Sequence, residues 1–446
     1  MVSKYRNHRC LQITLSGWLT VVVLVLASIA LLWATGTSAA DDHRSSNLGS
    51  GGGGRVNTAA AGSIGQSLDA FSFQLLRRVG GGENLVVSPY SVATTLGMVG
   101  AGAAHETARQ IERVLHTSSL LQMDGELASL RAQLGQEQSQ AGESDPADAA
   151  QLAMSSGAWV QSQLAVRPAF DSTLVDDFAA PLQMENFAAD PELATSDING
   201  WVANNTGQRL QNILAPGAIS TDTRLVVAST IYLAAHWRLP FDPKLTRPES
   251  FVTAGGRHAP TEFMRQSGPA SRFPYASGPD YRAIDLPYRG SDLSMLVVMP
   301  DRNGLASFQR HFNASKLNQV IGGLRERTVD LGMPRFHLNF REGLNAVLAA
   351  MGMPNAFHPG VADFSGIAGD PGSLYLSLLM HAADLEVDEQ GTIASAASVG
   401  IVDTISAPLA LRAVRLTLNH PFLYFIRDDA TGTILFAGRL ADPATE

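Results

Sequence analysis

Apolar residues recur at helical spacing in the first third of the chain. Residues 67–78 carry them three and four positions apart, which predicts an amphipathic helix. Ser88 stands before Pro89, a pattern typical of a helix start, and the Ala- and Gly-rich stretch after it predicts a second helix up to Gly102. Residues 107–115 predict a third, short amphipathic helix.

The later part of the chain carries the patterns of strands. Residues 225–237 and 293–299 are continuous apolar runs, typical of strands buried on both faces. Residues 422–426 and 433–440 are two further apolar runs joined by a polar connection that contains Gly432, which predicts a β-hairpin. Helices come early and strands late, and this order favours an α+β protein.

One segment near the C-terminus is neither a good helix nor a good core strand. Residues 388–398 begin with Asp388 and Glu389, turn on Gly391, and continue through small side chains that bury little apolar area. The first charge after Glu389 is Asp403 and the first proline is Pro408, so nothing between them prevents β pairing. A segment that can be a loop or a strand is a candidate switch.

The N-terminus has the organisation of a targeting segment. Lys4, Arg6 and Arg9 precede an uncharged stretch over residues 11–40 that ends in small residues. Residues 1–40 therefore predict either a cleaved signal peptide or an uncleaved signal anchor that spans the membrane through residues 11–40. Both readings place the rest of the chain outside the cytoplasm. The Gly-rich residues 41–62 predict a flexible linker.

Composition narrows the function classes. The 446 residues carry a net charge of −9, which argues against nucleic acid as a partner. Cys10 is the only cysteine and lies in the N-terminal segment, so the exported part is stabilised by its core rather than by disulfides. The length alone allows two or three domains. The polar, acidic residues 139–149 predict a surface loop.

Conventional catalytic motifs do not appear in the sequence. His105 and Glu106 begin like a zinc-protease helix, but Arg109 stands where the second histidine ligand belongs. The chain has no Gly-x-Ser-x-Gly nucleophile motif and no histidine pair at metal-ligand spacing. We therefore expect no enzyme, no metal and no cofactor.

Several motifs in order and at family spacing resemble those of serpins. They are Asn84 to Ser91, Ile231 to Trp237, Leu331 to Phe336, Glu389 to Ala397, Asn419 to Arg427 and Thr431 to Arg439. The resemblance covers about residues 65–445 and implies one serpin domain over residues 63–446. Its fold would have a large central β-sheet, two further sheets, about nine helices and an exposed reactive loop over about residues 389–415.

The resemblance also implies a mechanism, because a serpin offers its reactive loop as bait to a serine protease. Cleavage leaves the protease bound as an acyl-enzyme, and the freed loop enters the main sheet as an extra strand. Alternate residues from Thr392 to Gly400 would then face the core, and none is charged. The hinge of the loop corresponds to Glu389, Gln390, Gly391, Thr392, Ile393, Ala394, Ser395, Ala396 and Ala397. Ile393 departs from the family, which commonly has an acidic residue there.

Counting in the family's register places the scissile bond between Ile405 and Ser406, with a shift of one residue in either direction left open. An apolar residue before the bond implies an elastase-like or subtilisin-like serine protease as partner. The loop's composition favours an inhibitor, and the alternative is a non-inhibitory binding or carrier protein on the same fold.

Five residues correspond to positions that control sheet opening in the family: Ser88, Ser91, Ser229, Trp237 and His381. The family usually has asparagine where this chain has Ser229, and the shorter side chain leaves its connection to His381 open. On the helix expected near residues 121–134, Arg131 is accompanied by Asp124 and Glu126, so no heparin cofactor is expected. We expect a monomer.

Overall fold

The computed structural model describes residues 58–144, 150–301, 304–392 and 413–444, all within one compact unit. Nine α-helices lie within these residues, which agrees with the predicted number. They are α2 (Thr58–Arg78), α3 (Pro89–Gly100), α4 (His105–Leu115), α5 (Leu120–Ser144), α6 (Pro168–Phe178), α7 (Pro191–Asn205), α8 (Leu305–His311), α9 (Ala314–Gly323) and α10 (Asn345–Met351). Two 3-10 helices, η1 (Pro243–Leu245) and η2 (Pro354–Phe357), complete the helical elements of this part of the chain.

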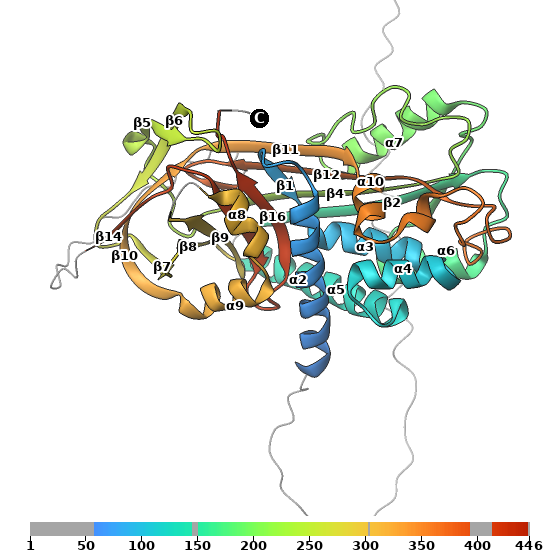
Figure 1. Ribbon diagram of the computed structural model, residues 1–446, viewed down its shortest axis with the longest axis horizontal. Coiled ribbons are helices and arrows are strands. Elements are labelled where there is room, and N and C mark those ends of the chain that lie inside the picture. The colour runs from blue at the N-terminus through green and yellow to red at the C-terminus, as the bar shows by residue number, and fades with distance from the viewer. Residues whose placement is uncertain (1–57, 145–149, 302–303, 393–412, 445–446) are drawn as a thin grey trace, which may run out of the picture. The chain divides into compact units, whose positions relative to one another are not determined.

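A six-stranded sheet crosses the middle of the molecule (Figure 1). Its strands, in spatial order, are β11 (Phe336–Gly343), β12 (Leu376–Val387), β13 (Gly391–Thr392), β4 (Leu225–His236), β2 (Gln151–Gln161) and β3 (Leu182–Glu185). The β11–β12 and β2–β4 ladders are antiparallel, whereas β12 and β4 also pair directly and in parallel. The parallel β12–β4 ladder therefore lies between two antiparallel ones, and a second, shorter parallel ladder joins β2 to the edge strand β3.

The other strands form a ten-stranded sheet, which the second half of the chain mainly supplies. Its strands are β1 (Leu85–Val87), β16 (Ile434–Leu440), β15 (Phe422–Asp428), β9 (Leu293–Pro300), β8 (Tyr281–Pro287), β7 (Arg272–Ser277), β10 (Arg325–Pro334), β6 (His258–Gln266), β5 (Arg247–Val252) and β14 (Val414–Thr417), which pairs with β10. The first half of β10 pairs with β7 and its second half with β6. One long strand thus joins the two further sheets that the resemblance implies.

Strand β4 separates two apolar cores. Val227 and Ile231 belong to the main cluster, which also includes side chains of α2 and α3. Val226 and Ala228 point the other way, into a smaller cluster with α7. Figure 1 shows α7 on one side of the sheet and α3 on the other. Because both faces are covered, β4 is almost continuously buried, as its apolar run predicts.

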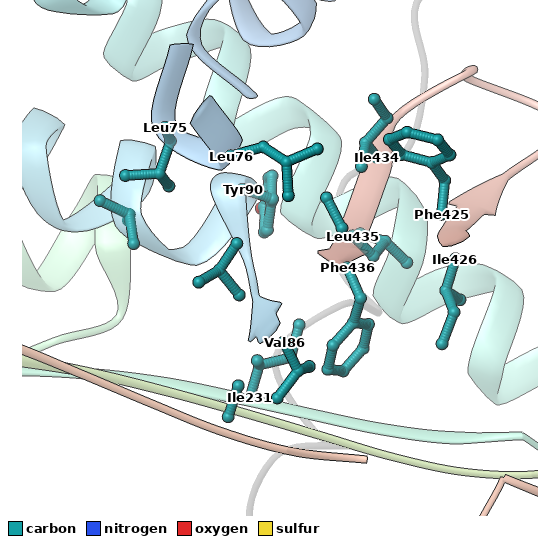
Figure 2. Packing of buried hydrophobic residues seen from close by; sticks show 14 of the residues in the cluster. Leu75, Leu76, Val86, Tyr90, Ile231, Phe425, Ile426, Ile434, Leu435 and Phe436 are labelled. Atoms are coloured by element: carbon teal, nitrogen blue, oxygen red, sulfur yellow. The ribbon is translucent and has the colours of Figure 1, made fainter. Parts of the chain in front are cut away.

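The closing hairpin β15–β16 lies at the centre of the main core. Every residue of both strands is buried, and Figure 2 shows Phe425, Ile434 and Leu435 facing side chains such as Leu76 of α2. Full burial of one such side chain stabilises the fold by about 1.5–3 kcal/mol. The predicted hairpin and the buried strands are confirmed.

The helix predictions are confirmed in position but not always in length. Helix α2 begins at Thr58, well before the predicted residue 67, and the alanines there favour helix. Helix α5 continues to Ser144, so the prediction of a surface loop from residue 139 is wrong over its first half. Glutamine, glutamate and alanine dominate residues 136–143, and proline first occurs at Pro146. Residues 145–149 lie outside the described part.

Within the described residues, no helix is both long enough and apolar enough to cross a membrane. Residues 11–40, on which the anchor prediction rests, lie outside that part of the chain.

Candidate functional site

The parallel ladder between β12 and β4, which we call the seam, ends before the strands do. It runs from Leu376 opposite Leu225 to Asp384 opposite Tyr232. Beyond that pair the strands are parted, and Thr392 of β13 lies between Val387 and Ala235 of the two strands. Parallel pairing is slightly less stable per residue than antiparallel pairing. Per residue, the seam is therefore slightly less stable than the two antiparallel ladders that flank it.

Thr392 is fully buried at the open end of the seam. Its hydroxyl lies 2.6 Å from the Tyr288 hydroxyl, and the Tyr288 ring stacks on Trp237 with centroids 4.6 Å apart. Burial raises the pKa of Tyr288 well above its ordinary value, so the phenol remains neutral and can donate to Thr392. Thr392 shares its strand face with neighbours that belong to the main core. Thr392 thus points inward, as the sequence predicts.

Glycine is the only residue type that fits position 391 in β13. A Cβ atom there would lie 1.9 Å from the Ala235 carbonyl oxygen. Heavy atoms do not approach that closely without displacement of the backbone, so any side chain would push β13 away from β4. The glycine of the hinge is therefore explained by close approach of two backbones.

Trp237 holds the turn that leads into β13. Its backbone N–H donates to the Gln390 carbonyl at 2.8 Å, and its indole Nε1–H donates to the Asp388 carbonyl at 2.9 Å. The Asp388 carboxylate accepts the N–H groups of Gln390 and Gly391 at 2.8 and 3.1 Å. These bonds satisfy the backbone of the turn and fix the direction in which the chain enters the sheet.

Glu389 is the only hinge residue in the described part that forms an ion pair. Its side chain is 4% exposed, and Arg335 donates from Nε to both carboxylate oxygens, at 2.9 and 2.8 Å. A further Arg335 donor and the Thr246 hydroxyl also contact the carboxylate. A buried carboxylate needs such partners because an unpaired buried charge costs several kcal/mol. Sequence reasoning missed the role of Arg335, although Arg335 and Glu389 both lie in motifs that resemble those of serpins.

The polar cluster Ser88, Ser91, Ser229 and His381 lies at the middle of the seam. The Ser88 backbone N–H donates to His381 Nε2 at 3.0 Å, and the Ser88 hydroxyl caps α3 and donates to Ser91. Because Nε2 accepts, the ring proton of neutral His381 is on Nδ1, 2.9 Å from the Ser229 hydroxyl. The connection that the sequence left open is therefore made. Ser229 and His381 are direct partners in the parallel register, so a short side chain suffices.

His381 is buried completely, and this burial lowers its pKa from 6.5 to about 3. The ring is therefore neutral at physiological pH and acts as a hydrogen-bonding group rather than as a charge. It has a partner at each ring nitrogen and stands against the Phe340 ring. The cluster joins α3, β4 and β12 across the seam without any formal charge.

The structure thus separates the five predicted control residues into two places. Trp237 stands at the open end with the hinge, and the other four form the cluster at mid-seam. Of the hinge, Glu389, Gln390, Gly391 and Thr392 are described. Ile393, Ala394, Ser395, Ala396 and Ala397 lie outside the described residues, as do Ile405 and Ser406, so the position of the reactive bond stays a prediction.

Within the part of the chain that the structure describes, no group of three or more His, Cys, Asp or Glu side chains could hold a metal ion. His105, the start of the motif that resembles a zinc site, is the first residue of α4. Its Nδ1 atom lies 2.7 Å from Asp363 Oδ2. The histidine is a helix-start residue with a carboxylate partner.

Comparisons with known proteins agree with this geometry. The family model Serpin (serine protease inhibitor) matches residues 66–443. Human serpin B3 is 32% identical over 395 residues, covering 85% of this chain and all of the relative. A leukocyte elastase inhibitor of Xenopus tropicalis is 31% identical over 383 residues, covering 84% of this chain and 97% of the relative.

Solved structures share the fold. The thermophilic serpin tengpin in its native state has a TM-score of 0.76 at 24% identity, covering 85% of this chain and 94% of that chain. Human thyroxine-binding globulin in complex with thyroxine has a TM-score of 0.75 at 22% identity, covering 86% and 100%. The family match spans most of the chain and includes the seam and the hinge. This chain belongs to the serpin (serine protease inhibitor) family.

Proposed function

We propose that this protein is an exported inhibitor of a serine protease and acts once, as a suicide substrate. After cleavage the reactive loop would enter the seam and hold the protease as an acyl-enzyme. The observation that carries the proposal is the place of β13, because Gly391 and Thr392 already lie between β12 and β4. This position supports the proposal, because an inserting loop would continue from it between the same two strands.

The register of β13 supports the path. Thr392 pairs antiparallel to both β12 and β4, so a strand that continues from it would form two antiparallel ladders in place of one parallel ladder. The continued register pairs each second loop residue with one inward residue of β12 and one of β4. These sets are Ala394 with Leu385 and Leu233, Ala396 with Ala383 and Ile231, and Ser398 with His381 and Ser229.

The side chains of the loop suit those places. Small, uncharged residues can fill an inward row without desolvating a charge, and each added ladder gains backbone hydrogen bonds. Ser398 would come to the polar cluster, where a hydroxyl can take the place of the Ser229–His381 hydrogen bond that insertion separates. The loop would thus bring a polar residue, Ser398, to the polar cluster on its insertion path. This match supports an inhibitor.

The target follows from the expected bond between Ile405 and Ser406. We propose an elastase-like or subtilisin-like protease, because an apolar residue before the bond suits a shallow apolar pocket. The similarity to leukocyte elastase inhibitors supports the same class. The protein would act as a monomer, and membership in the family supports a role other than enzyme.

Export rests on the sequence of residues 1–40. We propose that this segment carries the chain across a membrane and is either removed or kept as an anchor. N-terminal sequencing of the exported protein and extraction of membranes with carbonate would distinguish the two. A mature N-terminus near residue 41 in a soluble fraction indicates cleavage.

The test is complex formation with pancreatic elastase and with subtilisin. Purified full-length protein should give an SDS-stable complex whose mass is that of the protease plus the chain cleaved in its reactive loop. Thr392→Arg should be cleaved at the same bond without a stable complex, because the arginine would enter the buried space beside Tyr288. Thr392→Val, which keeps the size of the side chain and adds no charge, is the matched control and should still trap the protease.

Two outcomes would count against the proposal. Cleavage of the native protein with no complex and no gain in thermal stability indicates a non-inhibitory serpin, such as a carrier. Normal trapping by Thr392→Arg would contradict the insertion path itself.

A further inference from the structure

A hollow of about 650 Å³ lies away from the seam, where five segments meet, among them the residues just before β15. We call it the α2–α8 pocket. The end of α2 and the glycine turn after it form one wall, the β5–β6 turn and the start of α8 form two others, and the end of β16 contributes the floor. Its lining residues include Arg77, Gly81, Ala254, Arg310, His420 and Arg439.

The pocket carries charge of one sign. Three of its described lining residues are arginines, and none of the described ones is an aspartate or a glutamate. The chain as a whole has a net charge of −9, so a hollow whose charged lining residues are arginines runs against the overall balance. A cleft lined by one sign of charge concentrates the field inside it and attracts counter-ions.

Arg439 is the floor of the pocket and is 1% exposed. Its guanidinium donates to the carbonyls of Glu83 at 2.7 Å, Val79 at 3.1 Å and Leu76 at 3.3 Å. Two of these carbonyls lie at the C-terminal end of α2, whose helix dipole offsets only part of a unit charge. Among the described residues Arg439 forms no ion pair, so much of its buried positive charge remains unbalanced by a carboxylate.

The rim adds donors that can reach a ligand. Arg77 donates to the Phe312 carbonyl at 3.4 Å, a long bond that leaves most of its guanidinium available, and Arg310 is exposed on α8. His420 is partly buried, and burial lowers its pKa, so it adds no positive charge to the rim at neutral pH. Two carboxylates outside the pocket lining also act on these side chains. The charge of Asp301 raises the pKa of His420, and the charge of Glu83 raises the pKa of Arg439.

We propose that the α2–α8 pocket binds a phosphate or sulfate group, either as the free ion or as part of a small polar molecule. Guanidinium groups match the oxygens of such groups with paired hydrogen bonds, and the exposed Arg77 and Arg310 can contact a dianion directly, while the buried charge of Arg439 attracts it from the floor. The volume exceeds that of a free oxyanion, which leaves room for a sugar-sized substituent. The site is separate from the reactive loop and does not depend on the inhibitory function.

The test is calorimetric titration of the full-length protein in mild detergent with inorganic phosphate, ribose 5-phosphate and ribose, at fixed ionic strength set by chloride. Saturable phosphate binding with a matching rise of the thermal midpoint is expected, and ribose should not bind. Tighter binding of ribose 5-phosphate than of phosphate would assign the site to a phosphorylated molecule, and the reverse order to the free ion.

Variants locate the binding. Arg310→Gln, at an exposed position that folding does not require, should weaken phosphate affinity at least tenfold. Arg327→Gln, an exposed arginine of β10 away from the pocket, is the control and should leave affinity unchanged. Equal affinity in the two variants, or no saturable binding of either phosphate compound at millimolar concentration, overturns the proposal. Complex formation with the protease should be the same in both variants, so a failure here is distinct from a failure of the inhibitor assignment.

Discussion

The two places on the seam that hold the predicted control residues are built in different ways. At the open end, a buried carboxylate, Glu389, is held by Arg335, and aromatic rings enclose Thr392. At mid-seam, serine hydroxyls and the neutral ring of His381 join the strands without formal charge. The first arrangement anchors a strand end that has already entered the sheet. The second joins the strands that would part in the proposed loop insertion.

The contrast has a physical reason. A charged pair at the open end of the seam stays partly hydrated through Arg335, whose side chain is 47% exposed, and so can be strong without a large desolvation cost. A charge at the fully buried cluster would make every separation of the strands expensive. Short neutral hydrogen bonds of about 1 kcal/mol each can be exchanged for those of an incoming strand.

The largest effect is expected where the backbone approach is closest. Gly391→Ala should expel β13 from the sheet and cost about 3 kcal/mol, the upper end of usual overpacking effects, because its Cβ would overlap the Ala235 carbonyl. Thermal unfolding and hydrogen exchange of residues 388–392 measure the change. Gly125→Ala, in an open place on α5, is the control and should be neutral or slightly stabilising. Equal behaviour of the two variants would show that β13 is not held as described.

Removing one partner of the ion pair at the open end should cost more stability than removing the other. Arg335→Ala leaves Glu389 buried without its cation and should cost about 2–3 kcal/mol, below the usual range because the arginine is half exposed. Glu389→Gln should cost less, since the freed Arg335 can be hydrated. Chemical denaturation of both variants and of the double variant gives the coupling energy. A larger loss for Glu389→Gln than for Arg335→Ala would reverse our account of this end.

Acid should weaken the mid-seam cluster. The pKa of His381 is about 3 in the folded protein and 6.5 when unfolded, so the unfolded chain binds more protons between these values. Stability present above pH 6.5 is therefore lost as pH falls, by roughly 2 kcal/mol at pH 5. Thermal midpoints measured from pH 7.5 to 4.5 report this slope. His381→Gln should flatten it, whereas His258→Gln, at an exposed histidine, should not.

Other buried groups change the stability with pH in the opposite direction. The pH dependence of one variant alone therefore cannot be assigned to His381. Burial, with a contribution from nearby Asp177, raises the pKa of Asp124 to about 7, so its contribution is lost as pH rises from 3.8 through 7. Only a difference between the two histidine variants isolates the cluster. An unchanged slope in His381→Gln would contradict the assignment.

The smallest effect concerns the hydroxyl that completes the cluster. Ser229→Ala removes the acceptor of the His381 Nδ1 proton and should cost about 1–2 kcal/mol. It should also speed loop insertion, because one cross-seam bond is gone. Ser156→Ala, at the position paired with Ser229 on β2, is the control and should change stability by less than about 0.5 kcal/mol. Stopped-flow measurement of complex formation tests the rate.

Local signals predicted much of the fold. The apolar runs of β4 and β9, the capped start of α3 and the closing hairpin all follow from patterns within a few residues. The error at α5 came from reading polarity as loop, although the residues are good helix formers. The site was predicted less completely: Glu389 was identified, but its partner Arg335 lies 54 residues away and no local pattern links them.

The sequence by itself determined the properties that depend on each residue alone: small, uncharged side chains after Gly391, a histidine between apolar neighbours, and serines at a helix start. The tertiary structure decided which of these residues meet. Strand register brings Ser229 opposite His381 and places Thr392 between β12 and β4, and a shift of one residue would reverse every side chain. Register is set by packing across the whole sheet, and for that reason the contacts along the seam follow from the tertiary structure and not from any local pattern.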